Sequence, residues 1–202
     1  MLGFAVFFLA RLLGNLYFIN NIRCEALIAR CRRQLITDAV PFLFFFLAFV
    51  IRTLLKDGFA VNPETQEIVM EPFKYFHNLL AMPYLLVLFL VGVAGVLYGL
   101  VKSIFCTSYT KGIWAAGIGT VFTVLALLLV VGYNNTAYYP STADMQSSLT
   151  LANSCSSQFT LRVMAYVSIL VPFVLAYIVY AWRAIDKKPI TSKELKEDDH
   201  SY

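Results

Sequence analysis

The chain has 202 residues, of which 59% are hydrophobic and only 14% are charged, and its net charge at pH 7 is +4. Soluble domains average about 25% charged residues, so this composition excludes an ordinary soluble domain and indicates an integral membrane protein. The pI is about 8.9, but the basic residues lie beside apolar runs, so nucleic acid is not expected as a partner.

The first apolar run covers residues 2–19 and predicts a membrane-spanning helix. It lacks the basic flank and the small-residue cleavage site of a signal peptide. Arg11 and Asn15 lie four residues apart, on one helical face. An arginine at mid-membrane costs roughly 2.5–3.5 kcal/mol on insertion scales, so we expect Arg11 to face protein, water or a lipid headgroup.

A basic segment, residues 20–37, separates this run from a second predicted span over residues 39–55. The segment holds four arginines against one glutamate, which predicts a cytoplasmic position. It is expected to be a loop or a short interfacial helix. Thr37 and Asp38 are candidates for capping the second span, with Pro41 in its first turn.

The segment 56–78 carries an acidic excess, which predicts that it lies outside, and the alternation at residues 67–70 allows a small hairpin. The third predicted span covers residues 79–101. Gly95 and Gly99 form a GxxxG motif in this span. Such small-residue stripes favour close packing against another helix, and we prefer that interpretation to a substrate groove.

A short loop with Lys102 and Lys111 precedes the fourth predicted span, residues 112–133. The two lysines predict a cytoplasmic position for this loop. The long segment 134–160 contains no Lys or Arg, so we expect it outside. Its aromatic content is that of a packed segment, which predicts a structured cap over the helices.

The fifth predicted span covers residues 161–182 and contains Pro172. Proline removes the backbone partner of the carbonyl at Ser168, so this helix is expected to bend. Residues 186–202 form a charged segment and are predicted to be a flexible tail. The loops therefore predict an all-α bundle of about five membrane helices, with the N-terminus outside and the C-terminus in the cytoplasm.

Few residues have side chains that could act in catalysis or bind a cofactor. Haem needs axial ligands, usually His, Met or Cys, and the two histidines, His77 and His200, both lie outside the predicted spans. The four cysteines form no CxxC pair. We therefore expect no catalytic, cofactor-binding or metal-binding residue. The candidates for a structural role are Arg11, Asn15, Asp38, Gly95, Gly99 and Pro172.

Three sequence segments follow one another near the end of the chain: NNTAYYPS from residue 134, SSLTLANSCSSQFTL from residue 147, and VPFVLAYIVYAWR from residue 171. In this order they resemble the end of subunit II of the cytochrome bd quinol oxidases. The resemblance covers the chain but corresponds only to the C-terminal half of the usual subunit, as in a fragment or a split subunit.

The resemblance implies a non-haem structural subunit of a quinol:oxygen oxidoreductase in the cell inner membrane. It implies haem b, haem d and the quinol site in a partner subunit I, and the missing N-terminal half of subunit II as a second partner. The alternative is a small multispan transporter or permease component. Transport sites show broken helices near the midplane, and only Pro172 and the Arg11–Asn15 pair come near that pattern.

Overall fold

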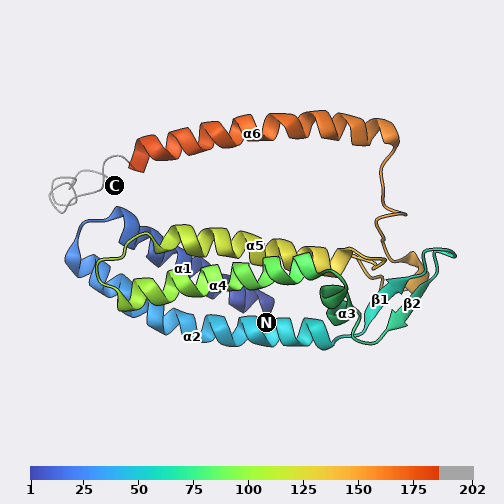
Figure 1. The fold of residues 1–202 in the computed structure, drawn as a ribbon, viewed down its shortest axis with the longest axis horizontal. Coiled ribbons are helices and arrows are strands. Elements are labelled where there is room, and N and C mark those ends of the chain that lie inside the picture. The colour runs from blue at the N-terminus through green and yellow to red at the C-terminus, as the bar shows by residue number, and fades with distance from the viewer. Residues whose placement is uncertain (187–202) are drawn as a thin grey trace.

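The computed structural model describes residues 1–186, and five of its helices are long and apolar enough to cross a membrane (Figure 1). This is the all-α membrane fold expected from composition. The long helices are α1 (Leu2–Asn21), α2 (Glu25–Leu55), α4 (Pro83–Phe105), α5 (Gly112–Gly132) and α6 (Gln158–Asp186). The short elements are β1 (Gly58–Val61), β2 (Ile68–Glu71), α3 (Lys74–Ala81) and the 3-10 turn η1 (Met145–Ser147).

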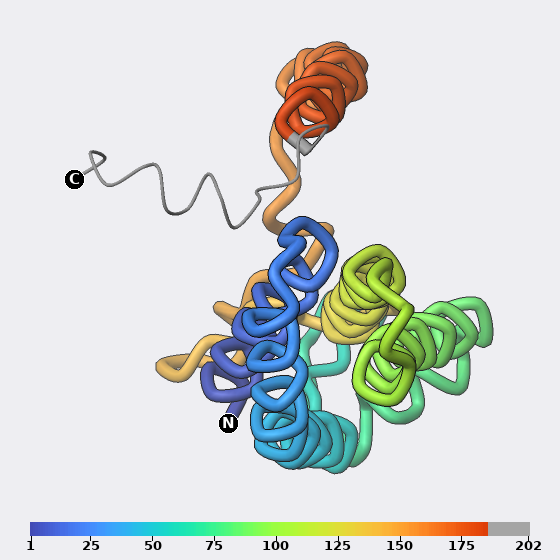
Figure 2. Tube along the Cα trace, turned by 90° about the vertical axis from the view of Figure 1, so that its left-hand side faces the viewer, coloured from blue at the N-terminus to red at the C-terminus, as the bar shows by residue number. Residues whose placement is uncertain are grey.

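Helices α1, α2, α4 and α5 form a four-helix bundle, seen end-on in Figure 2. In this bundle α1 packs mainly on α2, and α4 packs mainly on α5. Apolar side chains from all four helices meet in its centre. The buried set is Leu12, Leu16, Ile19, Leu35, Phe42, Val96, Leu100 and Ala116.

Helix α2 differs from its prediction. We expected a separate segment at 20–37 and a span beginning at residue 39, but α2 runs without interruption through Asp38 and Pro41. The capping role predicted for Asp38 is therefore wrong. The helix continues because its first half has its own apolar face, which packs on the bundle core through Ile28, Cys31 and Leu35.

The third predicted span also begins later than expected. Residues 74–81 form the separate helix α3, and α4 starts at Pro83, which occupies the first helical position. Proline suits that position because its missing N–H would have no partner there. The break at Met82 thus divides one predicted span into the short helix α3 and the membrane-length helix α4.

The contact between α4 and α5 is made of small residues. A Cβ added at Gly92 would lie 2.6 Å from the backbone nitrogen of Thr123, and one added at Gly119 would lie 2.5 Å from the Gly92 carbonyl oxygen. The structure also places Gly95 and Gly99 in this contact, against Gly119 and Gly112. The two backbones are therefore as close as glycine permits.

Helix α6 runs alongside the four-helix bundle and is drawn apart from it in Figure 1. The rings of Trp182 and Tyr17 pack edge to face with centroids 6.1 Å apart. Residues 158–185 of α6 are all exposed except the half-buried Ala181. Pro172 lies inside this helix, and the nearby Ser168 hydroxyl donates to the Met164 carbonyl. The tail beyond Asp186, with His200, lies outside the described residues.

Candidate functional site

A buried carboxylate joins α1 to α2. Asp38 is 1% exposed, and its Oδ1 lies 3.1 Å from Nη2 of Arg11. Gln34 donates to the same oxygen at 3.1 Å, and Asn15 donates to Oδ2 at 3.5 Å. The carboxylate thus accepts from three side chains, which is how a buried charge is tolerated in an apolar surrounding.

Sequence reasoning placed Arg11 and Asn15 on one face but did not identify Asp38 as their partner. This pairing requires α2 to begin before residue 38, because the side chain of Asp38 then points from within the helix toward α1. The signal was present in the spacing of Gln34 and Asp38, which lie one helical turn apart. We call these four residues, Arg11, Asn15, Gln34 and Asp38, the polar cluster.

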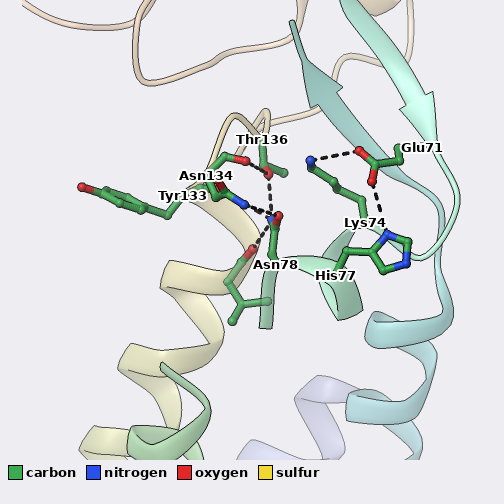
Figure 3. Close-up of polar contacts among 8 residues, drawn as sticks. Glu71, Lys74, His77, Asn78, Tyr133, Asn134 and Thr136 are labelled. Atoms are coloured by element: carbon green, nitrogen blue, oxygen red, sulfur yellow. Dashed lines mark hydrogen bonds and ion pairs between the residues drawn. The ribbon is translucent and has the colours of Figure 1, made fainter. Parts of the chain in front are cut away.

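A second polar group closes the end of the bundle that carries α3 and the strands (Figure 3). Asn78 of α3 is fully buried, and its amide donates to the Val130 carbonyl at 3.0 Å and to the Thr136 hydroxyl at 2.8 Å. The side-chain amide of Asn134 donates to the Asn78 amide oxygen at 3.2 Å. The last carbonyls of a helix lack partners, so Asn78 caps α5 from a different helix.

The chain after α5 turns by using left-handed backbone at Asn134 and Asn135, with φ of 56° and 51°. Asparagine adopts this conformation more readily than most residues. The turn brings Thr136 and Ala137 beside β1, where the Ala137 N–H donates to the Phe59 carbonyl. Farther on, Gln146 bonds both backbone groups of Ile68 in β2. Strands β1 and β2 pair as an antiparallel hairpin, and the segment predicted as a structured cap is therefore joined to this hairpin.

Asn78 was not predicted from sequence, and it gives a direct test of this cap. Replacing Asn78 by leucine removes the donor to Val130 and should lower the free energy of unfolding by about 1–3 kcal/mol, because a buried carbonyl loses its partner. Unfolding in detergent measures this. The matched control is Leu80→Ala, at a position of α3 that is 54% exposed, for which we expect a change within about 0.5 kcal/mol. Equal losses in both variants would contradict the capping role.

An ion pair lies next to this cap, outside the membrane helices. The Lys74 ammonium is 2.9 Å from Glu71, and Nδ1 of His77 is 3.3 Å from the other carboxylate oxygen. The hydrogen bond from Lys74 holds the pKa of Glu71 below its usual value, and His77 acts in the same direction. These groups fasten β2 to α3. The side chains of Glu71 and His77 are 36% and 54% exposed, which is typical of a surface pair and not of a buried catalytic site.

The remaining predicted residues do not gather into a reactive centre. All four cysteines are free thiols. Within residues 1–186 no three of the His, Cys, Asp and Glu side chains come together as metal ligands. A cavity of about 80 Å³ lies between the four bundle helices. Its two hydroxyls, on Thr120 and Thr123, both donate to carbonyls of their own helix, so the cavity offers only apolar contacts.

Comparison with known proteins decides the family. The model of the family "Cytochrome bd terminal oxidase subunit II" matches residues 1–185. The chain belongs to this family. Subunit 2 of the cytochrome bd-I ubiquinol oxidase from Escherichia coli K12 is 29% identical over 159 residues, and the same protein from strains O6:H1 and O157:H7 matches equally. The match covers 76% of this chain and 39% of the relatives.

The chain therefore spans about two fifths of the length of the curated relatives that it matches. Membership in the cytochrome bd subunit II family, together with five apolar helices, makes it a multi-pass protein of the cell inner membrane. The resemblance to subunit II of the cytochrome bd oxidases, which was drawn from the segments at residues 134–183, is confirmed by the family match.

Proposed function

We propose that this chain is a structural part of a cytochrome bd-type quinol:oxygen oxidoreductase and supports a haem-bearing subunit I without binding haem itself. The family match over residues 1–185 carries the proposal. It also favours the oxidase over a transporter component. The relatives that match are named as subunit 2 of a ubiquinol oxidase, and we infer the corresponding role here, with quinol oxidised and oxygen reduced in the partner.

The described side chains fit a supporting role. The polar cluster and the Asn78 cap use their hydrogen bonds to join one helix to another. Among the described residues the histidine is His77, which lies in α3 and outside the five membrane helices, and His200 lies beyond the described residues. Membrane haems are held by axial side chains on helices. We therefore place haem b and haem d in subunit I, and we count the remaining part of subunit II as a further partner.

Spectroscopy of purified material tests this function. Expressed alone, the chain should show no stoichiometric haem signal in a reduced-minus-oxidised spectrum. Expressed with the other oxidase polypeptides, it should co-purify with haem absorbance and quinol-dependent oxygen uptake. A haem signal from the chain alone would overturn the haem-free role, and absence of any haem-bearing partner would overturn the proposed complex.

We further propose that the end carrying β1, β2 and residues 134–157 lies outside and that residues 20–25 and 106–111 face the cytoplasm. The distribution of Lys and Arg supports this orientation. Cys155 is exposed at the proposed outer end. With the other three cysteines replaced, a membrane-impermeant maleimide should label Cys155 in intact cells. Labelling of Cys24 in the matching single-cysteine variant, without labelling of Cys155, would reverse the orientation.

A further inference from the structure

One end of the bundle carries a cluster of basic side chains. Residues 20–33, around the start of α2, and residues 102–111, at the connection between α4 and α5, together hold six Lys or Arg and a single acid, Glu25. Nη2 of Arg32 donates to the Thr107 carbonyl, so the two segments lie side by side. Within residues 1–186 none of these six cations forms an ion pair. This end therefore has a positive charge that the described part of the chain does not neutralise.

Lys102 is the cation of this cluster whose position is fixed by aromatic side chains. Its Nζ donates to the Tyr98 hydroxyl at 2.6 Å and lies 4.9 Å and 4.7 Å from the ring centroids of Tyr98 and Tyr109. An ammonium has three N–H donors, and among the described residues the structure shows an acceptor for one of them. The two rings thus hold the ammonium in place before any ligand binds, which lowers the entropic cost of binding.

The depth of Lys102 is set by the end of α4. Lys102 lies three residues before Phe105, the last residue of this helix, which is about 4.5 Å along the helix axis. Its long side chain can therefore place the ammonium at the level of the lipid headgroups. Tyr98, Val101 and Phe105 follow one another at helical spacing on the same side of α4, and all three are exposed. A cation thus borders an apolar stripe where a membrane-length helix ends.

We propose that Lys102 binds the phosphate of an anionic glycerophospholipid whose acyl chains lie along Tyr98, Val101 and Phe105. The ammonium donates to the phosphate oxygens, and the arginines of residues 20–33 attract negative headgroups to the same surface. A zwitterionic lipid brings a second cation with its phosphate, so the charge of this end favours the anionic class. The inference concerns the contact of this chain with the bilayer and does not depend on the proposed function.

Native mass spectrometry of the purified full chain tests this site. The chain is released from detergent micelles to which phosphatidylglycerol or phosphatidylcholine has been added, and the bound lipid is counted at each concentration. We expect phosphatidylglycerol to bind more tightly than phosphatidylcholine. Lys102→Gln should weaken the binding of phosphatidylglycerol about fivefold, as expected for the loss of one cation at the membrane surface, and should leave phosphatidylcholine binding unchanged.

Three further variants separate a built site from the general charge of the chain. Lys56→Gln is the matched control, because Lys56 is exposed at the other end of α2, and we expect a change of less than about twofold. Lys102→Arg keeps the charge and should keep most of the affinity. Tyr109→Leu keeps every charge but removes one ring from the ammonium, and it should weaken phosphatidylglycerol binding about threefold.

Four results would overturn the lipid site or decide it without the oxidase. Displacement of phosphatidylglycerol by inorganic phosphate would indicate a site for free anions and overturn the lipid site. Equal weakening by Lys102→Gln and Lys56→Gln would show attraction by charge without a site. Loss of the bound lipid when the haem-bearing subunit assembles would assign Lys102 to a protein contact and overturn the proposal. If no haem-bearing subunit co-purifies, the proposed function fails, and the measurements on the chain alone decide the lipid site.

Discussion

Replacing Gly119 by alanine should destabilise the bundle by about 3 kcal/mol or more, although the change adds a single methyl group. The new Cβ would lie 2.5 Å from the Gly92 carbonyl oxygen and 2.7 Å from the Val96 nitrogen. Both are backbone atoms of α4, which no rotamer change can move. The whole of α4 must therefore shift away from α5, and the contacts along the two helices weaken together.

Gly117 on the same helix provides the matched control. A Cβ added there meets nothing within 4 Å. Alanine has the higher helix propensity by about 1 kcal/mol in water, so Gly117→Ala should be neutral or slightly stabilising. Unfolding of both variants in the same detergent measures the difference. Equal effects would mean that the close contact between α4 and α5 is not what holds these helices together.

Replacing Asp38 by leucine should cost about 3–5 kcal/mol of folding stability, as when one partner is removed from a buried pair. Arg11 would keep its charge with no anion near it, and Gln34 would lose the oxygen to which it donates. Replacing both members of the pair, Arg11 and Asp38, by leucine should restore most of the loss, because no charge then remains in the apolar surrounding. A double-mutant cycle on the unfolding free energy measures this coupling.

Asp38→Asn is the conservative control for this pair. It keeps the size of the side chain and one acceptor oxygen, so the bond from Gln34 can persist while the ionic contact is lost. We expect an intermediate loss. If Asp38→Leu were no more harmful than the double replacement, Arg11 would be stable without its carboxylate, and the pair would not contribute to the joining of α1 and α2.

Hydropathy was sufficient to find five membrane helices, because each holds a long stretch of predominantly apolar residues. It failed at the start of α2, where the arginines among residues 25–37 conceal a periodic apolar face that only the neighbouring helix reveals. Small residues in α4 predicted close packing, but the partner, α5, came from the structure. Long-range polar contacts were the least predictable part, since Asn78 reaches groups 52 or more residues away.

The Asn78 cap also has a consequence for the order of events during synthesis. The contacts between α1 and α2 can form once residue 55 has entered the membrane. The Asn78 amide, in contrast, can bond Val130 only after a further 52 residues have been synthesised. Contacts that close such long loops form late. The hairpin end of a nascent chain should therefore remain open to added protease until α5 has been made, whereas the α1–α2 pair becomes resistant first.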